Sequence, residues 1–213
     1  MYLEKPSKLS FIKCLWKAEV TAAVNYDDPA RETWGIAFTE KTKGQLRAEL
    51  IGPSFGYQVL DSSIGDKYWG VDFYPQVTMQ GVIKTEVIGK FAQLPVINGC
   101  FVVGEDLYRI PSFEELESFC QELKRQGLIT DNSEKQQMIG LSLRSIQRLY
   151  RQQVGLTQKQ SAQIKRAQAA VRLLQNGEVP AQVAATTGFA DQAHLTRSLK
   201  SLYGKTPNQI RQS

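Results

Sequence analysis

Arginine, lysine and glutamine side chains recur at matching positions in two segments of the second half of the sequence. A shift of 49 positions brings seven pairs into register, among them Arg148 with Arg197, Arg151 with Lys200, and Gly155 with Gly204. Arginine and glutamine can form paired hydrogen bonds with guanine and adenine edges, and lysine suits phosphate contacts. We therefore expect both segments to bind double-stranded DNA. The candidate residues are Arg144, Gln147, Arg148 and Arg151 in the first segment, and Gln192, His194, Thr196, Arg197 and Lys200 in the second.

The charge of the chain is divided unequally. Residues 142–213 contain eleven Lys and Arg against two acidic residues, Glu178 and Asp191, whereas residues 1–141 contain 15 Lys and Arg against 19 Asp and Glu. A basic half beside a mildly acidic half indicates that only the second half meets a polyanion. The alternative is a basic face that contacts only water. The repeated pattern weakens that alternative, because two helices share the same arrangement.

Helices must hold these side chains, and the sequence predicts where they begin and end. Each predicted helix starts at a capping residue or a proline, and most end near a glycine. The predicted helices cover residues 142–153, 157–175, 180–188 and 191–204, followed by a turn from residue 206. The residues expected to face inward are Leu143, Ile146, Leu149, Tyr150 and Val154 in the first helix, Ile164, Ala167, Val171 and Leu174 in the second, and Leu195, Leu199 and Leu202 in the fourth.

The order of these helices is typical of two helix-turn-helix units. In such a unit a short helix, a tight turn and a second helix follow one another, and the second helix enters the DNA major groove. The connecting helix of about 19 residues would be roughly 28 Å long. That length is comparable to the ~34 Å between successive major-groove windows on one face of B-DNA. One chain could therefore place both recognition helices in neighbouring grooves.

The segment GFADQAHLTRSLKSLYGKTPNQIR, residues 188–211, resembles the C-terminal signature of the AraC/XylS family of bacterial transcription regulators. The matching positions are Ala184, Gly188, Phe189, Asp191, His194, Leu195, Arg197, Lys200, Gly204, Thr206 and Pro207. The resemblance covers residues 128–211 and implies two helix-turn-helix units in adjacent major grooves, usually activating transcription by helping RNA polymerase. Lys135 and Gln136 stand where the family usually has a Leu-Ala pair. We therefore expect the first unit to read bases less well than the second.

The first 110 residues alternate in the manner of β-strands. The clearest runs are residues 33–38, 45–51, 56–61, 68–74 and 100–104. This part also resembles a reduced domain found ahead of such DNA-binding regions, through Trp16, the run DDPARETWGIAF and the motif GVDFYP. We predict an α+β chain. A small, mainly β domain of the cupin-like or reduced-barrel kind, sensor-like or interacting, would cover residues 1–110, and an all-α double helix-turn-helix domain residues 111–213.

Aromatic side chains of the first domain have two interpretations. Trp16, Trp34, Trp69 and Phe73 could line a pocket for a small-molecule effector. They could instead form the core of a small β domain, and this second interpretation is favoured because large aromatic side chains ordinarily fill such a core. A third option is that the domain binds a protein and no small molecule.

The sequence contains no motif that indicates an enzyme. Cys14, Cys100 and Cys120 are widely separated, forming neither a metal-binding pair nor a disulfide framework. A reactive thiol would need nearby positive charge, and none is visible in the sequence. No phosphate loop or nucleophile elbow occurs. We predict no catalytic residue, metal or cofactor. A DNA repair or modifying enzyme that uses the helical half for targeting remains the alternative.

Nothing in the sequence points to a membrane. No run approaches the ~18 apolar residues of a spanning helix, and the first residues lack the apolar stretch of a signal peptide. We expect the chain to act in the cytoplasm. Its oligomeric state stays open, because two motifs in one chain permit binding as a monomer while the β domain could still form a homodimer.

Overall fold

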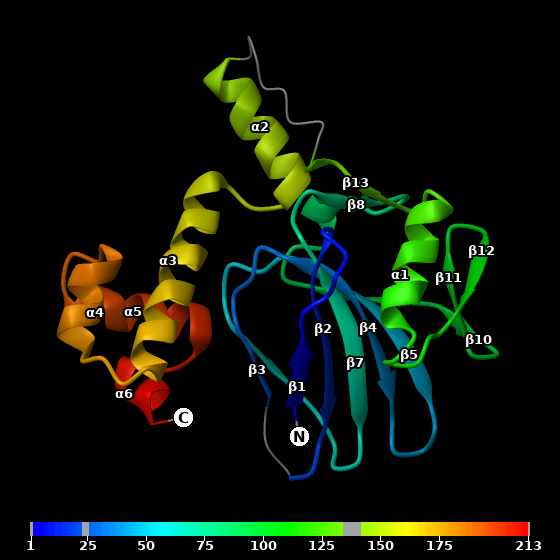
Figure 1. The fold of residues 1–213 in the computed structure, drawn as a ribbon, viewed down its shortest axis with the longest axis horizontal. Helices are drawn as coiled ribbons and strands as arrows, with labels where there is room; N and C mark the ends of the chain where they lie inside the picture. Colours follow the sequence, from blue (N-terminus) through cyan, green and yellow to red (C-terminus); the bar gives the residue numbers. More distant parts are fainter. Residues whose placement is uncertain (1, 23–25, 134–141, 213) are drawn as a thin grey trace.

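An antiparallel sheet of six strands forms the centre of the N-terminal part, in the order β1-β2-β7-β4-β5-β9 (Figure 1). The computed structural model describes residues 2–22, 26–133 and 142–212. The six strands are β1 (Tyr2–Lys5), β2 (Ile12–Glu19), β4 (Trp34–Glu40), β5 (Leu46–Ile51), β7 (Lys67–Phe73) and β9 (Phe91–Leu94). The strands predicted at residues 33–38, 45–51 and 68–74 are confirmed by β4, β5 and β7.

Three smaller sheets complete this part. Their strands are β10 (Val96–Ile97), β11 (Cys100–Val103) and β12 (Asp106–Arg109) in one sheet, β8 (Val77–Met79) with β13 (Ile129–Asp131) in another, and β3 (Tyr26–Asp28) with β6 (Gln58–Leu60) in the third. A short 3-10 helix, η1 (Lys84–Glu86), follows β8. The predicted strands at residues 56–61 and 100–104 are confirmed by β6 and β11.

The two faces of the central sheet differ in packing: one is buried in the main core and the other borders a cavity. Side chains alternate along a strand, so every second residue of β4 and β7 points to the same face. Ile36, Phe38, Val71 and Phe73 are almost completely buried in the main core. On the opposite face of β4, Ala37 lines a cavity. One face therefore stabilises the domain, and the other is partly hollow.

The main core continues past the domain boundary that we expected at residue 110. Helix α1 (Leu116–Arg125) packs Leu116, Cys120 and Leu123 into it, and β13 adds Ile129. Figure 1 shows α1 on the side of the sheet away from α3 to α6. Residues 111–131 therefore pack with the β domain, and the segment after residue 110 is not entirely helical.

Ser112 and Glu115 have the sequence spacing of a capping box, which predicts a helix start at Ser112, but the start of α1 differs from this pattern. The helix begins after Glu115, and no side chain caps it. The carboxylate of Glu115 accepts a hydrogen bond from the backbone N–H of Ser112 at 2.8 Å. One of the two hydrogen bonds of a capping box is therefore present, but it lies in a turn that precedes the helix.

Within residues 142–212, the structure describes five helices. They are α2 (Leu143–Val154), α3 (Gln158–Gln175), α4 (Pro180–Thr187), α5 (Gln192–Tyr203) and α6 (Pro207–Arg211). The predicted boundaries are confirmed: Ser142, Thr157, Asp191 and Thr206 cap four of these helices with their side chains, and Pro180 begins the other. Of the helices in the described ranges, none combines the length and apolar character of a membrane span.

A second core holds the helices together and includes residues of the β domain. Ile164, Leu174, Leu195 and Leu199 are fully buried at its centre. Ala30 from the β domain is buried in the same cluster, with Phe55 and Ile88 packed against it. The β domain therefore supplies part of the apolar surface that the helices bury.

Candidate DNA-binding surface

Helix α5 presents a polar face above a closed apolar layer. Leu195, Leu199 and Leu202 are buried on its inner face, against Val183 and Ala184 of α4. Asp191 caps the helix, accepting a hydrogen bond from the backbone N–H of His194 at 2.6 Å. Such a cap contributes about 1 kcal/mol. The helix is thus fixed at its start and along its inner face.

The five candidate residues on α5 divide into two groups. Gln192, Arg197 and Lys200 are exposed, whereas His194 and Thr196 are partly buried. The ring of His194 accepts a hydrogen bond from Ala190 N–H through Nδ1 at 3.4 Å and packs edge-on against Phe189, with ring centroids 5.3 Å apart. The hydroxyl of Thr196 donates to the carbonyl of Gln192 at 2.9 Å. These two side chains stabilise the turn and the helix, so three residues remain free to meet a ligand.

Helix α2 presents a similar polar face but lacks a comparable apolar layer. Arg144, Gln147, Arg148 and Arg151 are all exposed. Ser142 caps the helix, its hydroxyl accepting from Ser145 N–H at 3.2 Å. The caps and the outward face match those of α5. The difference lies on the inner face.

The inner stripe predicted for α2 is only partly buried. Val154 is buried, but Leu143 is 79% exposed, so the expectation that it faces a core is wrong. Among the described residues, the elements that pack most extensively on α2 are η1 and α3, and the contacts of Lys84 with Gln153 and of Pro53 with Gly155 lie at its C-terminal end. Figure 1 shows α2 clear of α4, α5 and α6. Lys135 and Gln136, on which the expectation of weaker base reading rested, lie outside the described residues.

A groove of about 860 Å³ joins the outward face of α2 to the start of α3. It is lined by Ser142, Arg144, Ser145, Gln147, Arg148, Arg151, Thr157, Gln158 and Lys159. All four candidate residues of α2 therefore meet in one concave surface. Gln158, which was not among the predicted site residues, and Lys159 join them from the first turn of α3, which begins at the capping box of Thr157. The positive end of the α3 dipole adds to the attraction for phosphate there.

Comparison with protein families identifies this region. Residues 137–213 match the model of the helix-turn-helix domain family. This segment is an AraC-type helix-turn-helix domain. Domains of this kind bind DNA, and α4 and α5 form one complete helix-turn-helix unit in this chain. None of the curated proteins compared with the chain matches it.

Solved structures with a similar course of the chain come from ToxT of Vibrio cholerae. One crystal form is 10% identical, with 99% of this chain and 97% of that chain covered and a TM-score of 0.42. ToxT bound to an unsaturated fatty acid is 12% identical, with coverage of 99% and 94% and a TM-score of 0.42. An apo variant of ToxT is 13% identical, with coverage of 97% and 98% and a TM-score of 0.43.

The cations of the helix-turn-helix domain are not equally available. In the described part of the chain, no ion pair involves Arg144, Arg148, Arg151, Arg197 or Lys200. By contrast, the ammonium groups of two lysines lie beside carboxylates of the β domain: Lys165 is 3.3 Å from Glu32 and Lys205 is 3.5 Å from Asp27. The five cations on the outward faces of α2 and α5 are thus uncompensated by an ion pair within the described residues.

The aromatic residues proposed for a ligand pocket separate in the structure. Trp34 and Phe73 are buried in the main core, with ring centroids 4.8 Å apart. Trp69 packs beside Phe38 and donates its indole N–H to the carbonyl of Pro111 at 2.8 Å. Trp16, by contrast, lines two cavities among the described residues. The core interpretation therefore holds for the other three.

The cavity beside Trp16 has a volume of about 270 Å³ and lies against the second face of the central sheet. Its lining includes Ala37, Arg47 and Glu49, together with Phe91 from β9. Burial raises the pKa of Glu49. A neighbouring cavity of about 200 Å³ shares Trp16 and Phe91, and also reaches Gln168 and Tyr203 of the helix-turn-helix domain.

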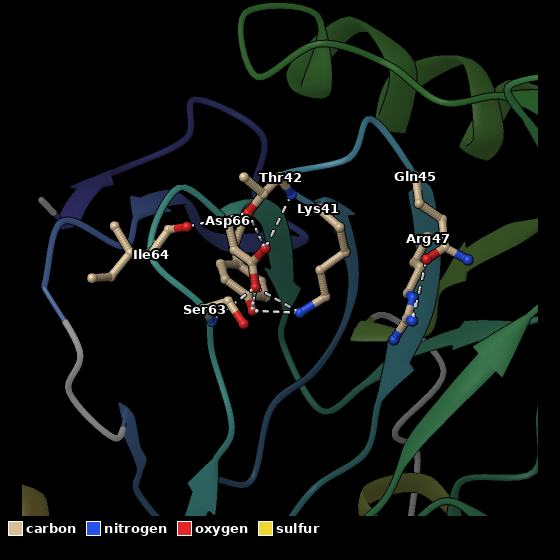
Figure 2. Close-up of polar contacts among 8 residues, drawn as sticks. Lys41, Thr42, Gln45, Arg47, Ser63, Ile64 and Asp66 are labelled. Atoms are coloured by element: carbon tan, nitrogen blue, oxygen red, sulfur yellow. Dashed lines mark hydrogen bonds and ion pairs between the residues drawn. The ribbon is translucent and has the colours of Figure 1, made fainter.

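A polar cluster fixes one end of the larger cavity (Figure 2). Asp66 is 1% exposed and accepts hydrogen bonds from the ammonium group of Lys41 at 2.7 Å, from Ser63 N–H at 3.0 Å and from Thr42 N–H at 3.3 Å. Burial acts to raise the pKa of Asp66, but these hydrogen bonds outweigh it and hold the pKa well below its ordinary value. Because Lys41 and Tyr68 line the cavity, the cluster holds its rim in place.

The two buried cysteines, Cys14 and Cys120, show no sign of activation. Burial raises the pKa of the Cys14 thiol far above its ordinary value, and it raises that of Cys120 to about 12. Both thiols are therefore protonated at neutral pH, which argues against a nucleophilic role. In the described ranges, no group of three or more His, Cys, Asp or Glu side chains is suited to a metal ion.

Proposed function

We propose that the chain regulates transcription by placing α5 and α2 in adjacent major grooves of one DNA site. The observation that carries this proposal is the pair of exposed polar faces, one on each recognition helix, whose cations have no ion-pair partner among the described residues. The 18-residue helix α3 lies between them in sequence and is about 27 Å long at 1.5 Å per residue. This suits a site whose two windows lie about one helical turn apart.

The two helices would contribute differently. Helix α5 is held by a closed core, so Arg197 and Gln192 can keep the geometry that a paired hydrogen bond to a base requires. Helix α2 is held mainly at one end, and phosphate contacts tolerate displacement better. Its three arginines and the groove at the start of α3 therefore suit the DNA backbone.

Selection of bound fragments from genomic DNA tests this function directly. The purified full-length chain should enrich a common sequence with two half-sites. Replacing the exposed Arg197 and Lys200 with alanine should abolish the enrichment. Arg125→Ala is the matched control, because Arg125 is an exposed arginine of α1 outside the helix-turn-helix domain. Enrichment without any common sequence would contradict sequence-specific binding.

A small-molecule effector in the 270 Å³ cavity is the second part of the proposal. Trp16, Ile51, Leu60 and Phe91 give it apolar walls, and Arg47 supplies a charge. Sites of this kind suit a ligand with an apolar body and a polar end. The proposal extends no further than this class of ligand.

Filling the cavity tests the effector site. Ala37 is 4% exposed and lines the cavity, so Ala37→Leu should remove the space that a ligand needs. The variant should no longer respond to a compound that raises the melting temperature of the wild-type chain. Ala169→Leu, on the exposed side of α3, is the matched control and should respond as the wild type does. A response retained in Ala37→Leu would place the ligand elsewhere.

Activation through RNA polymerase in the cytoplasm is the proposed outcome of DNA binding. A promoter reporter carrying the selected site should be expressed more strongly when the chain is present. Reduced expression would identify a repressor. Sedimentation of the chain, free and on its DNA site, would show whether it binds as a monomer or as a homodimer.

A further inference from the structure

The glycines that end the two recognition helices contact the same loop of the β domain. Gly155 follows α2 and Gly204 follows α5, both in the left-handed conformation, and the two glycines occupy equivalent positions of the internal repeat. The loop consists of residues 52–57, between β5 and β6. We call it the 52–57 loop.

Pro53 in this loop meets the end of α2. A Cβ atom placed on Gly155 would lie 2.7 Å from Cγ of Pro53 and 3.5 Å from a side-chain carbon of Ile88, so the loop approaches as closely as a glycine allows. The ammonium group of Lys84 in η1 donates to the carbonyl of Gln153, in the last turn of α2, at 2.6 Å. The C-terminal end of α2 is therefore seated on the β domain.

Tyr57 in the same loop meets the end of α5. A Cβ atom placed on Gly204 would lie 2.7 Å from the ring of Tyr57. The backbone N–H of Tyr57 donates to the carbonyl of Ser201 at 3.2 Å, and that of Ala30 donates to the carbonyl of Leu202 at 2.8 Å. Phe55, between the two contact residues, packs against the core of the helices.

The 52–57 loop is itself firmly held. The carbonyl of Pro53 accepts a hydrogen bond from Gly89 N–H at 2.8 Å, and Ser54 exchanges two backbone hydrogen bonds of 2.9 Å with Arg31. The hydroxyl of Ser54 donates to the carbonyl of Gly56 at 2.8 Å. Because each end of the loop and its middle are bonded to neighbouring strands and turns, it can act as a rigid support.

We propose that the 52–57 loop sets the position of the two recognition helices relative to each other, with Pro53 and Tyr57 as its positioning residues. Helix α5 has a core of its own, whereas α2 packs mainly on η1 and α3 among the described elements. The connecting helix α3 alone would leave the position of α2 relative to α5 adjustable. A support shared by the ends of both helices therefore fixes their distance and angle. The separation of half-sites that the chain accepts on DNA follows from this geometry.

The same loop connects the helices to the cavity of the β domain. Ile51 precedes the loop, Leu60 closely follows it, and both line the cavity of about 270 Å³. A ligand that displaces either residue would shift the support and with it the spacing of the helices. This consequence rests on the proposed function, whereas the positioning role of the loop does not.

A distance measurement tests the positioning role without DNA. Spin labels on cysteines placed at Gln152 of α2 and Ala193 of α5, both exposed, report the separation of the helices in the full-length chain. Cys100 is replaced by serine, because it is only partly buried, whereas Cys14 and Cys120 are buried. The wild-type chain should give one narrow distance distribution.

Variants of the loop should change that distribution. Pro53→Ala and Tyr57→Ala, singly and together, should broaden or shift it, and Tyr57→Phe should restore it because the ring is kept. Tyr74→Ala is the matched control: Tyr74 is 39% exposed and Tyr57 is 41% exposed, but Tyr74 has no contact with the helix ends among those described. Narrow, unchanged distributions in folded single and double variants would overturn the proposal.

DNA sites with altered spacing test the consequence for function. The wild-type chain should bind its site about tenfold or more tightly than one with an extra base pair between the half-sites. Tyr57→Ala should lose most of this preference while binding an isolated α5 half-site as the wild type does. An unchanged preference would overturn the proposal. Failure of the wild-type chain to bind any DNA would instead refute the proposed function and leave the distance measurement to decide.

Discussion

The two recognition helices carry the same local signals but have different surroundings. Each begins at a side-chain cap and ends at a left-handed glycine, Gly155 or Gly204. Helix α5 then buries Leu195 and Leu199 completely, whereas Leu143 at the start of α2 is 79% exposed. The outward faces of the two helices are alike in charge and exposure.

This difference separates what forms a helix from what holds it. Caps and end glycines act within one turn, so the sequence around each helix is enough to define its ends. Rigidity comes from tertiary packing, which depends on a partner surface. α4 and the second core supply that surface for α5, whereas the β domain supplies it at one end of α2. We therefore expect α5 to read bases and α2 mainly to contact phosphates.

The largest expected effect is the salt dependence of DNA binding, which tests whether α2 contributes more phosphate contacts than α5. With about six phosphate contacts, affinity for DNA should fall on the order of 10³-fold between 50 and 200 mM salt. The slope of the logarithm of affinity against the logarithm of salt concentration counts these contacts. Replacing Arg144, Arg148 and Arg151 together with alanine should lower the magnitude of this slope by about three. Replacing Arg197 and Lys200 should lower it less, because Arg197 is expected to contact bases.

Titration of the wild-type chain and both variants at four salt concentrations measures these slopes. A flat profile for the wild type would refute binding through phosphates. A larger change in slope from the α5 variant than from the α2 variant would reverse the assignment of roles.

Truncation of one leucine in each helix gives the next largest effect. Leu195 is fully buried, so Leu195→Ala should lower the free energy of unfolding by about 2–5 kcal/mol. Leu143→Ala removes an exposed side chain and should change it by no more than about 0.5 kcal/mol. Chemical denaturation of both variants measures the difference. A loss in Leu143→Ala similar to that in Leu195→Ala would show that α2 has a core of its own.

Much of the helical half could be predicted from sequence because its signals are local. Ser142, Thr157 and Asp191 cap helices as predicted, and the stripe of Leu195, Leu199 and Leu202 is buried as predicted. A periodic apolar stripe shows that a helix face needs a partner but does not identify the partner. For that reason the packing of α1 on the β core and the exposure of Leu143 were not foreseen.

The candidate site was predictable to a similar extent. Side-chain type and periodicity were enough to find the outward residues of both recognition helices. The structural roles of His194 and Thr196 depend on hydrogen bonds formed in the folded chain, and the contacts of the 52–57 loop join residues about 100 or more positions apart in sequence. Alternation predicted the strands of the β domain but could not tell which face would be filled, so Trp34 and Phe73 were candidates for a pocket that Trp16 lines.

Base discrimination gives a smaller effect that tests the comparison directly. A paired contact between arginine and a base is worth about 1–3 kcal/mol against the wrong base, whereas a lost phosphate contact weakens all sequences alike. Arg197→Ala should therefore reduce the difference in affinity between the selected site and a scrambled one more than Arg148→Ala does. Both variants are measured at one fixed salt concentration. A greater reduction in Arg148→Ala would make α2 the better reader.

The last part of the comparison concerns how the two helix ends are anchored at different pH. Backbone hydrogen bonds from Ala30 and Tyr57 hold the end of α5, whereas the buried ammonium group of Lys84 holds the end of α2. Burial lowers the pKa of Lys84 from 10.5 to about 7. Between pH 7 and about 10 the unfolded chain therefore binds more protons at this residue than the folded chain does. In that range the free energy of unfolding should rise with pH, by at most about 1.4 kcal/mol per unit.

Lys84→Met isolates this contribution. The variant keeps the apolar stem but cannot titrate, so its free energy of unfolding should rise less between pH 7 and 9 than that of the wild type. Denaturation curves at pH 7, 8 and 9 for both chains give the comparison. If the two slopes are equal, Lys84 stays charged beside the carbonyl of Gln153 throughout this range, because the negative end of the α2 dipole compensates for its burial. The end of α2 would then be anchored as independently of pH as the end of α5, and the contrast between the two helices would be confined to their inner faces.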